Sequence, residues 1–335
     1  MVNRVPRELG ASTACSPPDA IVVGFSDRSG GMGRALWEAA LWAARRQVDI
    51  MLVTCVDRHH RTGSEASEGD RQRRHHALYA VNGAAYRLAT STDVSQQVHT
   101  AVVEQPAVDA LVAASATAGL IVLQHRRLGT VARLRAGSTT AAVVARAGCA
   151  VLVVHADDQI AVQRGILVAL DRHEPDDRVL FEAFEESSRR GVPLTAVHLA
   201  RGPTTMSAGR TPVSSSSVRA ADDLADHLAG WQLRYPDVGV RRAVLGEPSL
   251  AGVLALAEDC DLLVVTRARA GHPTSPRLDA MTRRIITEAP CPVLVTPPAA
   301  EGQRLLPLTP VAERDRHPTS ASATPAGSIT PQIET

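Results

Sequence analysis

The sequence repeats itself at one constant offset, and this repeat limits the folds that the chain can adopt. Displacing the chain by 142 positions superposes similar residues without a gap through apolar and polar stretches alike. The coinciding pairs are Val98 with Val240, Ala101 with Ala243, Val102 with Val244, Pro106 with Pro248, Gly129 with Gly271 and Cys149 with Cys291. Such self-similarity is the signature of a duplicated structural unit. The 335 residues therefore predict two copies of one domain rather than a single large domain.

Short apolar runs alternate with helix-length amphipathic segments in both copies. The runs lie at 21–25, 50–56, 101–103, 120–123 and 150–154, and again at 166–170, 194–197, 243–245, 262–265 and 293–295. Continuous rather than alternating hydrophobicity is typical of strands that are buried on both faces of a parallel sheet. Each copy is therefore predicted to be a Rossmann-like α/β sandwich with five parallel strands and about four crossover helices.

The predicted boundaries place domain 1 at residues 19–155 and domain 2 at residues 164–298, with a short polar linker between them. Residues 1–18 and 299–335 contain many Pro, Ser, Thr and Ala residues and few large apolar ones. Such segments bury too little surface to offset the entropy of ordering, so both are predicted to be disordered tails. Two further polar stretches, 58–74 and 202–217, are predicted to be long loops.

Composition excludes several classes of function. Lys and Arg number 36 against 35 Asp and Glu, so the net charge of +1 provides no field for nucleic acid or an anionic membrane. No apolar run approaches the ~20 residues of a membrane-spanning helix, and the first twenty residues lack the apolar run of a secretory signal. The five cysteines form no C-x-x-C motif. These features favour a cytoplasmic protein in a reducing compartment.

Several stretches resemble the universal stress protein family, in its tandem two-domain actinobacterial form. They are IVVGF at 21–25, GCAVLV at 148–153, RRGVPLTAVH at 189–198 and PCPVLV at 290–295. The resemblance implies two sandwiches of the adenine nucleotide alpha hydrolase-like type, with any nucleotide at the carboxyl ends of the strands. It also implies that the two domains pair within the chain through their last strands, 150–154 against 293–295.

The resemblance implies a nucleotide site in domain 1 that is only partly retained. Members that bind ATP have an acid after the first strand and a G-x2-G-x9-G-[ST] loop after the fourth. The candidate site residues here are Gly24, Ser26, Val53, Arg127, Gly129, Gly137, Ser138 and Thr139. Ser26 replaces the acid, whereas Gln124 and Arg127 replace the first two glycines. Without glycines the loop cannot bring its amides to a phosphate, so the site is predicted to be vestigial.

Domain 2 departs further from the same pattern. Thr266 and Arg269 stand at the first two glycine positions, and Asp279 stands at the third, while Asp171 still follows the first strand. A carboxylate at a helix N-terminus competes with phosphate for the same positive end of the helix dipole. We therefore predict that domain 2 does not bind a nucleoside triphosphate.

Two further groups of residues allow either a functional site or an ordinary surface as their interpretation. The arginines around the former phosphate loops could form an anion-binding surface, but a solvated face is the favoured reading; they are Arg126, Arg127, Arg133, Arg135, Arg267, Arg269 and Arg277. The histidines His59, His60, His75 and His76 lie among arginines, which favours a surface loop over a metal site. Cys149 and Cys291 precede apolar strands and are predicted to pack in the core.

The sequence contains no nucleophile elbow, Walker loop or other catalytic constellation. The leading hypothesis is a non-enzymatic universal stress protein with a regulatory or protective role, exerted through an unidentified protein partner and without a cofactor. The alternative is an adenine-nucleotide sensor that binds ATP weakly, through domain 1 only. Further association into a homodimer stays open at this point.

Overall fold

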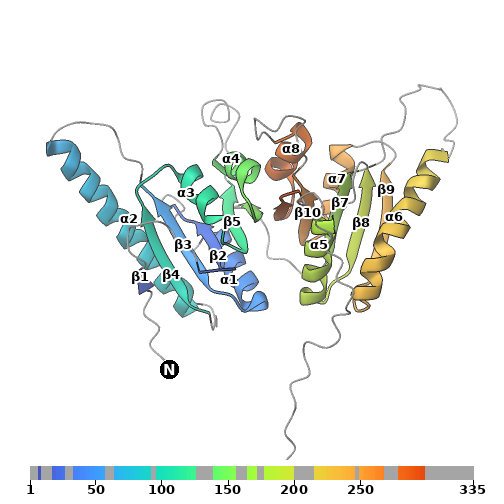
Figure 1. Ribbon diagram of the computed structural model, residues 1–335, viewed down its shortest axis with the longest axis horizontal. Coiled ribbons are helices and arrows are strands. Elements are labelled where there is room, and N and C mark those ends of the chain that lie inside the picture. The colour runs from blue at the N-terminus through green and yellow to red at the C-terminus, as the bar shows by residue number, and fades with distance from the viewer. Residues whose placement is uncertain are drawn as a thin grey trace, which may run out of the picture.

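The computed structural model describes eleven stretches of the chain, and Figure 1 shows how they are arranged. The described stretches are residues 7–8, 17–26, 33–56, 64–91, 96–125, 139–155, 164–171, 177–199, 215–245, 249–267 and 278–298. The elements of domain 1 are β2 Ile21–Gly24, α1 Arg34–Arg46, β3 Ile50–Cys55, α2 Ser64–Ser91, β4 Val98–Val103, α3 Ala107–Ala114, β5 Leu120–His125, α4 Thr139–Arg146 and β6 Ala150–His155. Those of domain 2 are β7 Ile166–Asp171, α5 Asp177–Arg190, β8 Leu194–Leu199, α6 Ser215–Arg234, β9 Val240–Leu245, α7 Leu250–Ala257, β10 Leu262–Thr266, α8 Ala280–Glu288 and β11 Val293–Thr296.

The strands of both domains belong to one sheet with the order β1-β4-β3-β2-β5-β6-β11-β10-β7-β8-β9, in which β1 is Arg7–Glu8. Within each domain all neighbouring strands are parallel, whereas β6 and β11 are antiparallel. These last two are the strands that the family resemblance implies as the seam. Leu152 lies opposite Leu294, its own equivalent in the repeat, so a pseudo-twofold axis passes through this pair.

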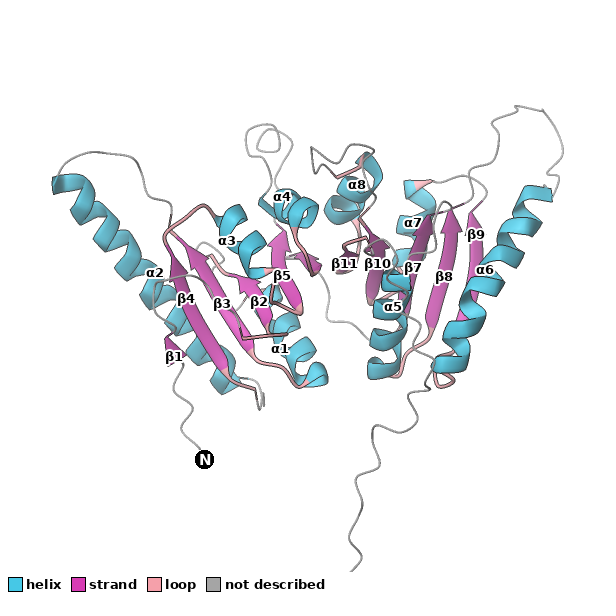
Figure 2. Ribbon diagram, in the orientation of Figure 1, coloured by secondary structure: helices cyan, strands magenta, loops and turns pink. Residues whose placement is uncertain are grey.

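Helices cover both faces of the sheet, and each face has one apolar core that runs through both domains (Figure 2). One core contains residues of α1, α2, α5 and α6, with Trp42 and Trp231 among its largest buried side chains. The other contains small aliphatic residues of α3, α4, α7 and α8. Strands buried between two helical layers explain why the sequence shows continuous apolar runs. The predicted α/β sandwich is confirmed, and the described part of each repeat contains five parallel strands and four helices.

The duplication is also visible in the turns that end equivalent helices. Gln47 follows α1 with φ of 55°, and Gly191 follows α5 with φ of 65°. The left-handed conformation ends a helix. Glycine adopts it without strain, whereas for other residues it raises the conformational free energy. Gln47 offsets part of that cost because its side-chain amide donates a 2.6 Å hydrogen bond to the Ala44 carbonyl. The shared backbone is thus kept even where the favourable residue is lost.

Two predictions on the polar segments are wrong. Arg7 and Glu8, in the segment predicted to be a disordered tail, form β1 and pair with His99 and Thr100 of β4. The stretch 58–74, predicted to be a loop, includes the start of α2, which begins at Ser64 and also contains His75 and His76. Helix α2 has few apolar residues in its first turns, so its periodicity was hidden. Residues 299–335 lie outside the described part of the chain.

Candidate nucleotide-site remnant and the domain interface

The carboxyl end of β2 in domain 1 is closely packed by the protein's own side chains. A Cβ atom on Gly24 would lie 2.7 Å from Leu123 Cδ2 and 3.3 Å from Leu111 Cδ1. Val53 beside it is buried on β3 and accepts a 2.8 Å hydrogen bond from the Phe25 amide. The glycine is therefore explained by close packing of leucines from β5 and α3, which accounts for its presence without a ligand.

Gln124, which stands where the family has the first loop glycine, lies at the N-terminus of α1. Its Oε1 accepts a long, 3.5 Å hydrogen bond from the Ala35 amide, one of the helix amides that has no partner within the helix. A Cβ atom on Gly33, the residue before α1, would lie 2.4 Å from the same Oε1. The side chain that replaces the glycine thus occupies a helix N-terminus, the kind of place where anions bind.

The remaining candidate residues of domain 1 are divided between described and undescribed parts of the chain. Ser26 is exposed just after β2, and Thr139 is exposed as the first residue of α4. The first turn of α4 contains no acidic residue. Arg127, Gly129, Gly137 and Ser138 lie outside the described residues. The structure therefore places Gly24, Ser26 and Val53 at the strand ends and leaves the loop between β5 and α4 undescribed.

In domain 2 the N-terminus of the corresponding helix, α8, is capped by Asp279. Its Oδ1 accepts a 2.8 Å hydrogen bond from the Thr282 amide, and its Oδ2 accepts a 2.5 Å bond from the Thr282 hydroxyl. Both carboxylate oxygens are thus engaged at the helix end, as a capping residue requires. Asp171 and Thr266 end β7 and β10, as the repeat predicts. Arg269 lies outside the described residues.

Arg267, one of the arginines predicted to lie on a solvated face, instead binds the other domain. It follows β10, and its Nη1 donates hydrogen bonds of 2.8 and 3.1 Å to the carbonyls of Val144 and Ala147 at the end of α4. These carbonyls have no partner within the helix, and a cation there also meets the negative end of the helix dipole. Burial lowers the pKa of Arg267. The favoured interpretation of this arginine was therefore wrong: it joins the domains.

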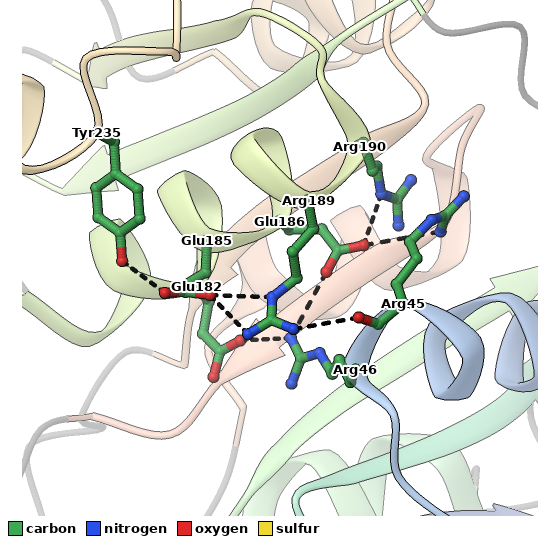
Figure 3. Close-up of polar contacts among 8 residues, drawn as sticks. All are labelled: Arg45, Arg46, Glu182, Glu185, Glu186, Arg189, Arg190 and Tyr235. Carbon is green, nitrogen blue, oxygen red and sulfur yellow. Dashed lines mark hydrogen bonds and ion pairs between the residues drawn. The ribbon is translucent and has the colours of Figure 1, made fainter. Parts of the chain in front are cut away.

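A second polar contact between the domains joins the ends of α1 and α5 (Figure 3). Arg46 of α1 donates a 2.9 Å hydrogen bond to Glu182 of α5 and lies 3.7 Å from Glu186. Glu186 is fully buried, and Arg190 of its own helix donates a 2.6 Å hydrogen bond to it. Although burial opposes the charge of Arg46, Glu182 and Glu186 outweigh it and raise the pKa of this arginine. Because Arg46 belongs to domain 1 and both glutamates belong to domain 2, these contacts form only when the domains are paired.

Beyond Glu186, the network includes an aromatic ring and an outer carboxylate. The guanidinium carbons of Arg46 and Arg190 lie 4.7 and 5.3 Å from the centre of the buried Trp42 ring, a cation–π arrangement. Glu185 accepts hydrogen bonds from Tyr235 at 2.8 Å and from Arg189, whose Nη1 reaches the Arg45 carbonyl of the other domain at 3.4 Å (Figure 3). Trp42 is thus buried in the core of domain 1 and also contacts domain 2 through Arg190.

The described residues provide no metal site and no activated thiol. No group of three or more His, Cys, Asp or Glu side chains within them could hold a metal ion. Cys149 and Cys291 are buried as predicted, and burial raises the pKa of Cys149 to about 12. Burial also raises the pKa of both Cys55 and Cys260 to about 11. A thiol with a raised pKa is a poor nucleophile. None of the described helices is long and apolar enough to cross a membrane.

Comparison with known proteins agrees with the architecture. The model of the Universal stress protein family matches residues 18–155 and 164–297. One universal stress protein of Mycobacterium tuberculosis is 32% identical over 210 residues, which cover 62% of this chain and 71% of the relative. Another is 28% identical over 266 residues, covering 75% and 88%. The crystal structure of a universal stress protein from Archaeoglobus fulgidus has a TM-score of 0.60 at 12% identity, covers 84% of this chain and 97% of that chain, and supports the fold alone.

The two family matches fall on the two repeats that share one sheet, and together they span most of the sequence. The fold is of the nucleotide-binding type, in which ligands lie at the carboxyl ends of parallel strands. This chain therefore belongs to the universal stress protein family.

Proposed function

We propose that this protein acts in the cytoplasm without catalysis, as a tandem universal stress protein that works through contacts with other proteins and has lost its nucleotide sites. The observation that carries this proposal is the occupation of two helix N-termini by the protein's own side chains. Asp279 engages α8 with both carboxylate oxygens, and Gln124 reaches the first turn of α1. A phosphate near Asp279 would be repelled by this half-buried carboxylate. It would also find the positive end of the helix dipole already occupied by that carboxylate.

The packing around Gly24 supports the same proposal. In a phosphate- or nucleoside-binding cradle, a glycine leaves room for the ligand. Here the methyl groups of Leu123 and Leu111 approach that position, and a Cβ atom on Gly24 would lie 2.7 and 3.3 Å from them. Nor do Cys55, Cys149 and Cys260 favour nucleophilic chemistry, because burial raises the pKa of each thiol.

The experiment uses the full chain as purified. After denaturation the supernatant is analysed for adenine nucleotides, and the native protein is incubated with ATP and Mg²⁺ while phosphate release is followed. We expect neither carried-over nucleotide nor phosphate above the rate in buffer. Stoichiometric adenine nucleotide would contradict the loss of the sites, and enzyme-dependent phosphate release would contradict the non-catalytic role.

A second candidate is an adenine-nucleotide sensor that binds through domain 1 only. The observation that favours domain 1 over domain 2 is the start of α4, which has an exposed Thr139 and no acid in its first turn, whereas α8 is capped by Asp279. If a fluorescent ATP analogue binds, Thr139→Asp should abolish binding by placing a carboxylate at this helix start. The matched variant Asp279→Ala should leave such binding unchanged. The reverse pattern would exclude the sensor in domain 1.

A further inference from the structure

The large apolar side chains that are exposed among the described residues lie on two equivalent helices. Tyr79 and Tyr86 of α2 are 80% and 64% exposed, and Leu233 of α6 is 81% exposed. Figure 1 shows α2 and α6 as the outermost helices at opposite ends of the molecule. Exposed aromatic and aliphatic side chains of this size are a feature of contact surfaces, particularly when they recur on one helix face.

On each helix the exposed apolar residues share a face with charged ones. Tyr79 and Tyr86 are seven positions apart, which is two helical turns, and Arg87 is exposed beside them. On α6, Asp222 and Asp226 are exposed and lie on the same side as Leu233. The opposite sides of the two helices are buried, through Val81, Ala85 and Leu88 on α2 and through Leu224, Leu228 and Trp231 on α6.

The two faces carry opposite charge. Helix α2 contains four arginines and three acidic residues, and the arginine on its exposed aromatic part is Arg87. Three of these arginines pair with Glu68, Asp70 and Glu104, while Arg87 has no ion pair within the described part of the chain. Asp222 and Asp226 likewise have none there. Contact between two α2 faces would oppose cation to cation, and contact between two α6 faces would oppose carboxylate to carboxylate. Contact between α2 and α6 is complementary in both charge and apolar character.

We propose that copies of this chain associate head to tail, with the α2 face of one copy (Tyr79, Tyr86 and Arg87) against the α6 face of the next (Asp222, Asp226 and Leu233). Because the two faces lie at opposite ends of the molecule, a heterologous contact of this kind leaves one free α2 face and one free α6 face on every pair. Association therefore continues beyond the dimer. The inference does not depend on whether either domain binds a nucleotide.

The test is sedimentation velocity of the full chain over a concentration series at low ionic strength. The wild-type protein should increase in mass with concentration beyond two chains. Added salt should reverse this increase, since the Debye length falls from about 30 Å at 0.01 M to about 3 Å at 1 M. A single-chain species at every concentration, or association that salt leaves unchanged, would overturn the proposal.

Two variants then separate head-to-tail contact from symmetric contact. The double variant Tyr79→Ser with Tyr86→Ser removes the α2 face, and Asp226→Lys with Leu233→Ser removes the α6 face. Each should sediment as a single chain, but their equimolar mixture should form one-to-one dimers and nothing larger. Unchanged melting temperatures show that the variants are folded, and Ala255→Ser, on the exposed side of α7, serves as the matched control that still associates. Association by either variant alone, or none in the mixture, would contradict the assignment.

Discussion

The two domains share the described strands and helices of the repeat, yet they differ at the helix ends where the resemblance implies a nucleotide site. In domain 2, Asp279 caps α8 with two strong hydrogen bonds. In domain 1, α4 begins with an exposed Thr139, and it is the N-terminus of α1 that receives a side chain, Gln124, through one long bond. The buried strands fix the fold, whereas the exposed residues at their ends can change without cost to the core. A common sheet is therefore no guarantee of a common site.

The same divergence appears at the domain interface where the equivalent helices α1 and α5 meet. Both α1 and α5 end in a pair of arginines, followed by a residue with positive φ. Four positions before the last arginine, α1 has Trp42 and α5 has Glu186. Two copies of domain 2 paired through this surface would bury two opposed glutamates, and two copies of domain 1 would leave four arginines without an acid. The difference thus favours pairing of domain 1 with domain 2.

The largest expected effect is on the contact between α1 and α5, and it comes from the substitution Glu186→Ala. The substitution removes the carboxylate that faces Arg45, Arg46 and Arg190. Removing one partner of a buried ionic group costs about 3–5 kcal/mol, so the urea midpoint of unfolding should fall sharply. Glu68→Ala, in which both partners of the broken pair are exposed, is the control and should cause no comparable loss. Equal midpoints for the two variants would show that the network adds nothing to pairing.

Substitutions at the helix N-termini should have a smaller effect on stability. Asp279→Ala removes both hydrogen bonds to Thr282, and the loss of an N-cap costs about 1 kcal/mol. Asp279→Ser keeps a capping oxygen and should recover most of this stability. Gln124→Ala should cost less than Asp279→Ala, because the Gln124 bond to the Ala35 amide is 3.5 Å long. Thermal unfolding measures all three, and a larger loss for Gln124→Ala would reverse the ranking.

Much of this architecture could be predicted from sequence, because each of the ten described strands of the repeats contains an apolar run. The runs were shorter than some strands: β9 begins with Val240, Arg241 and Arg242, and only its apolar end was visible. Strand β1 could not be found, since Arg7 and Glu8 pair through main-chain atoms that every residue carries. The first turns of α2 were hidden for a related reason, as they contain few apolar residues.

The site was less predictable than the fold. The motif predicted which positions had lost their glycines, and the capping role of Asp279 follows from residue type and place. Nothing in the sequence indicated that Arg267 reaches the carbonyls of Val144 and Ala147, because that contact depends on how the two domains meet. The same holds for the pairing of Arg46 with Glu182, residues that are far apart in the chain.

A pH-dependent effect of smaller size is expected from Glu185 in domain 2. Burial alone would raise its pKa, but hydrogen bonds from Tyr235 and Arg189 and the charge of Arg189 outweigh burial and hold the pKa below its usual value. A carboxyl group whose pKa is lowered by folding stabilises the protein above its unfolded pKa, about 4.3. That stability is lost as the pH falls from about 4.3 through the lower folded pKa. The stability difference between wild type and Glu185→Gln should therefore be constant near neutral pH and shrink below about pH 4; a difference that grows on acidification would contradict this.

The smallest effect concerns the two outer edges of the sheet. The strand β4 is mostly buried and is covered by β1, whereas β9 pairs with β8 alone among the described strands and exposes Arg241 and Arg242. Amide hydrogen exchange should therefore be slower at His99 and Thr100 than in β9. Deleting residues 1–16 should accelerate exchange at these two positions and leave β9 unchanged. If the deletion has no effect on β4, the pairing of β1 does not protect this edge.

The central claim about this protein is that domain 1 and domain 2 have both lost the ability to bind nucleotide. Calorimetric titration of the full chain with ATP, with and without Mg²⁺, tests this most directly. The account predicts only the heat of dilution in both titrations, because Asp279 and Gln124 occupy helix N-termini and leucines fill the space beside Gly24. A saturable heat that corresponds to one or two ATP molecules per chain would contradict it.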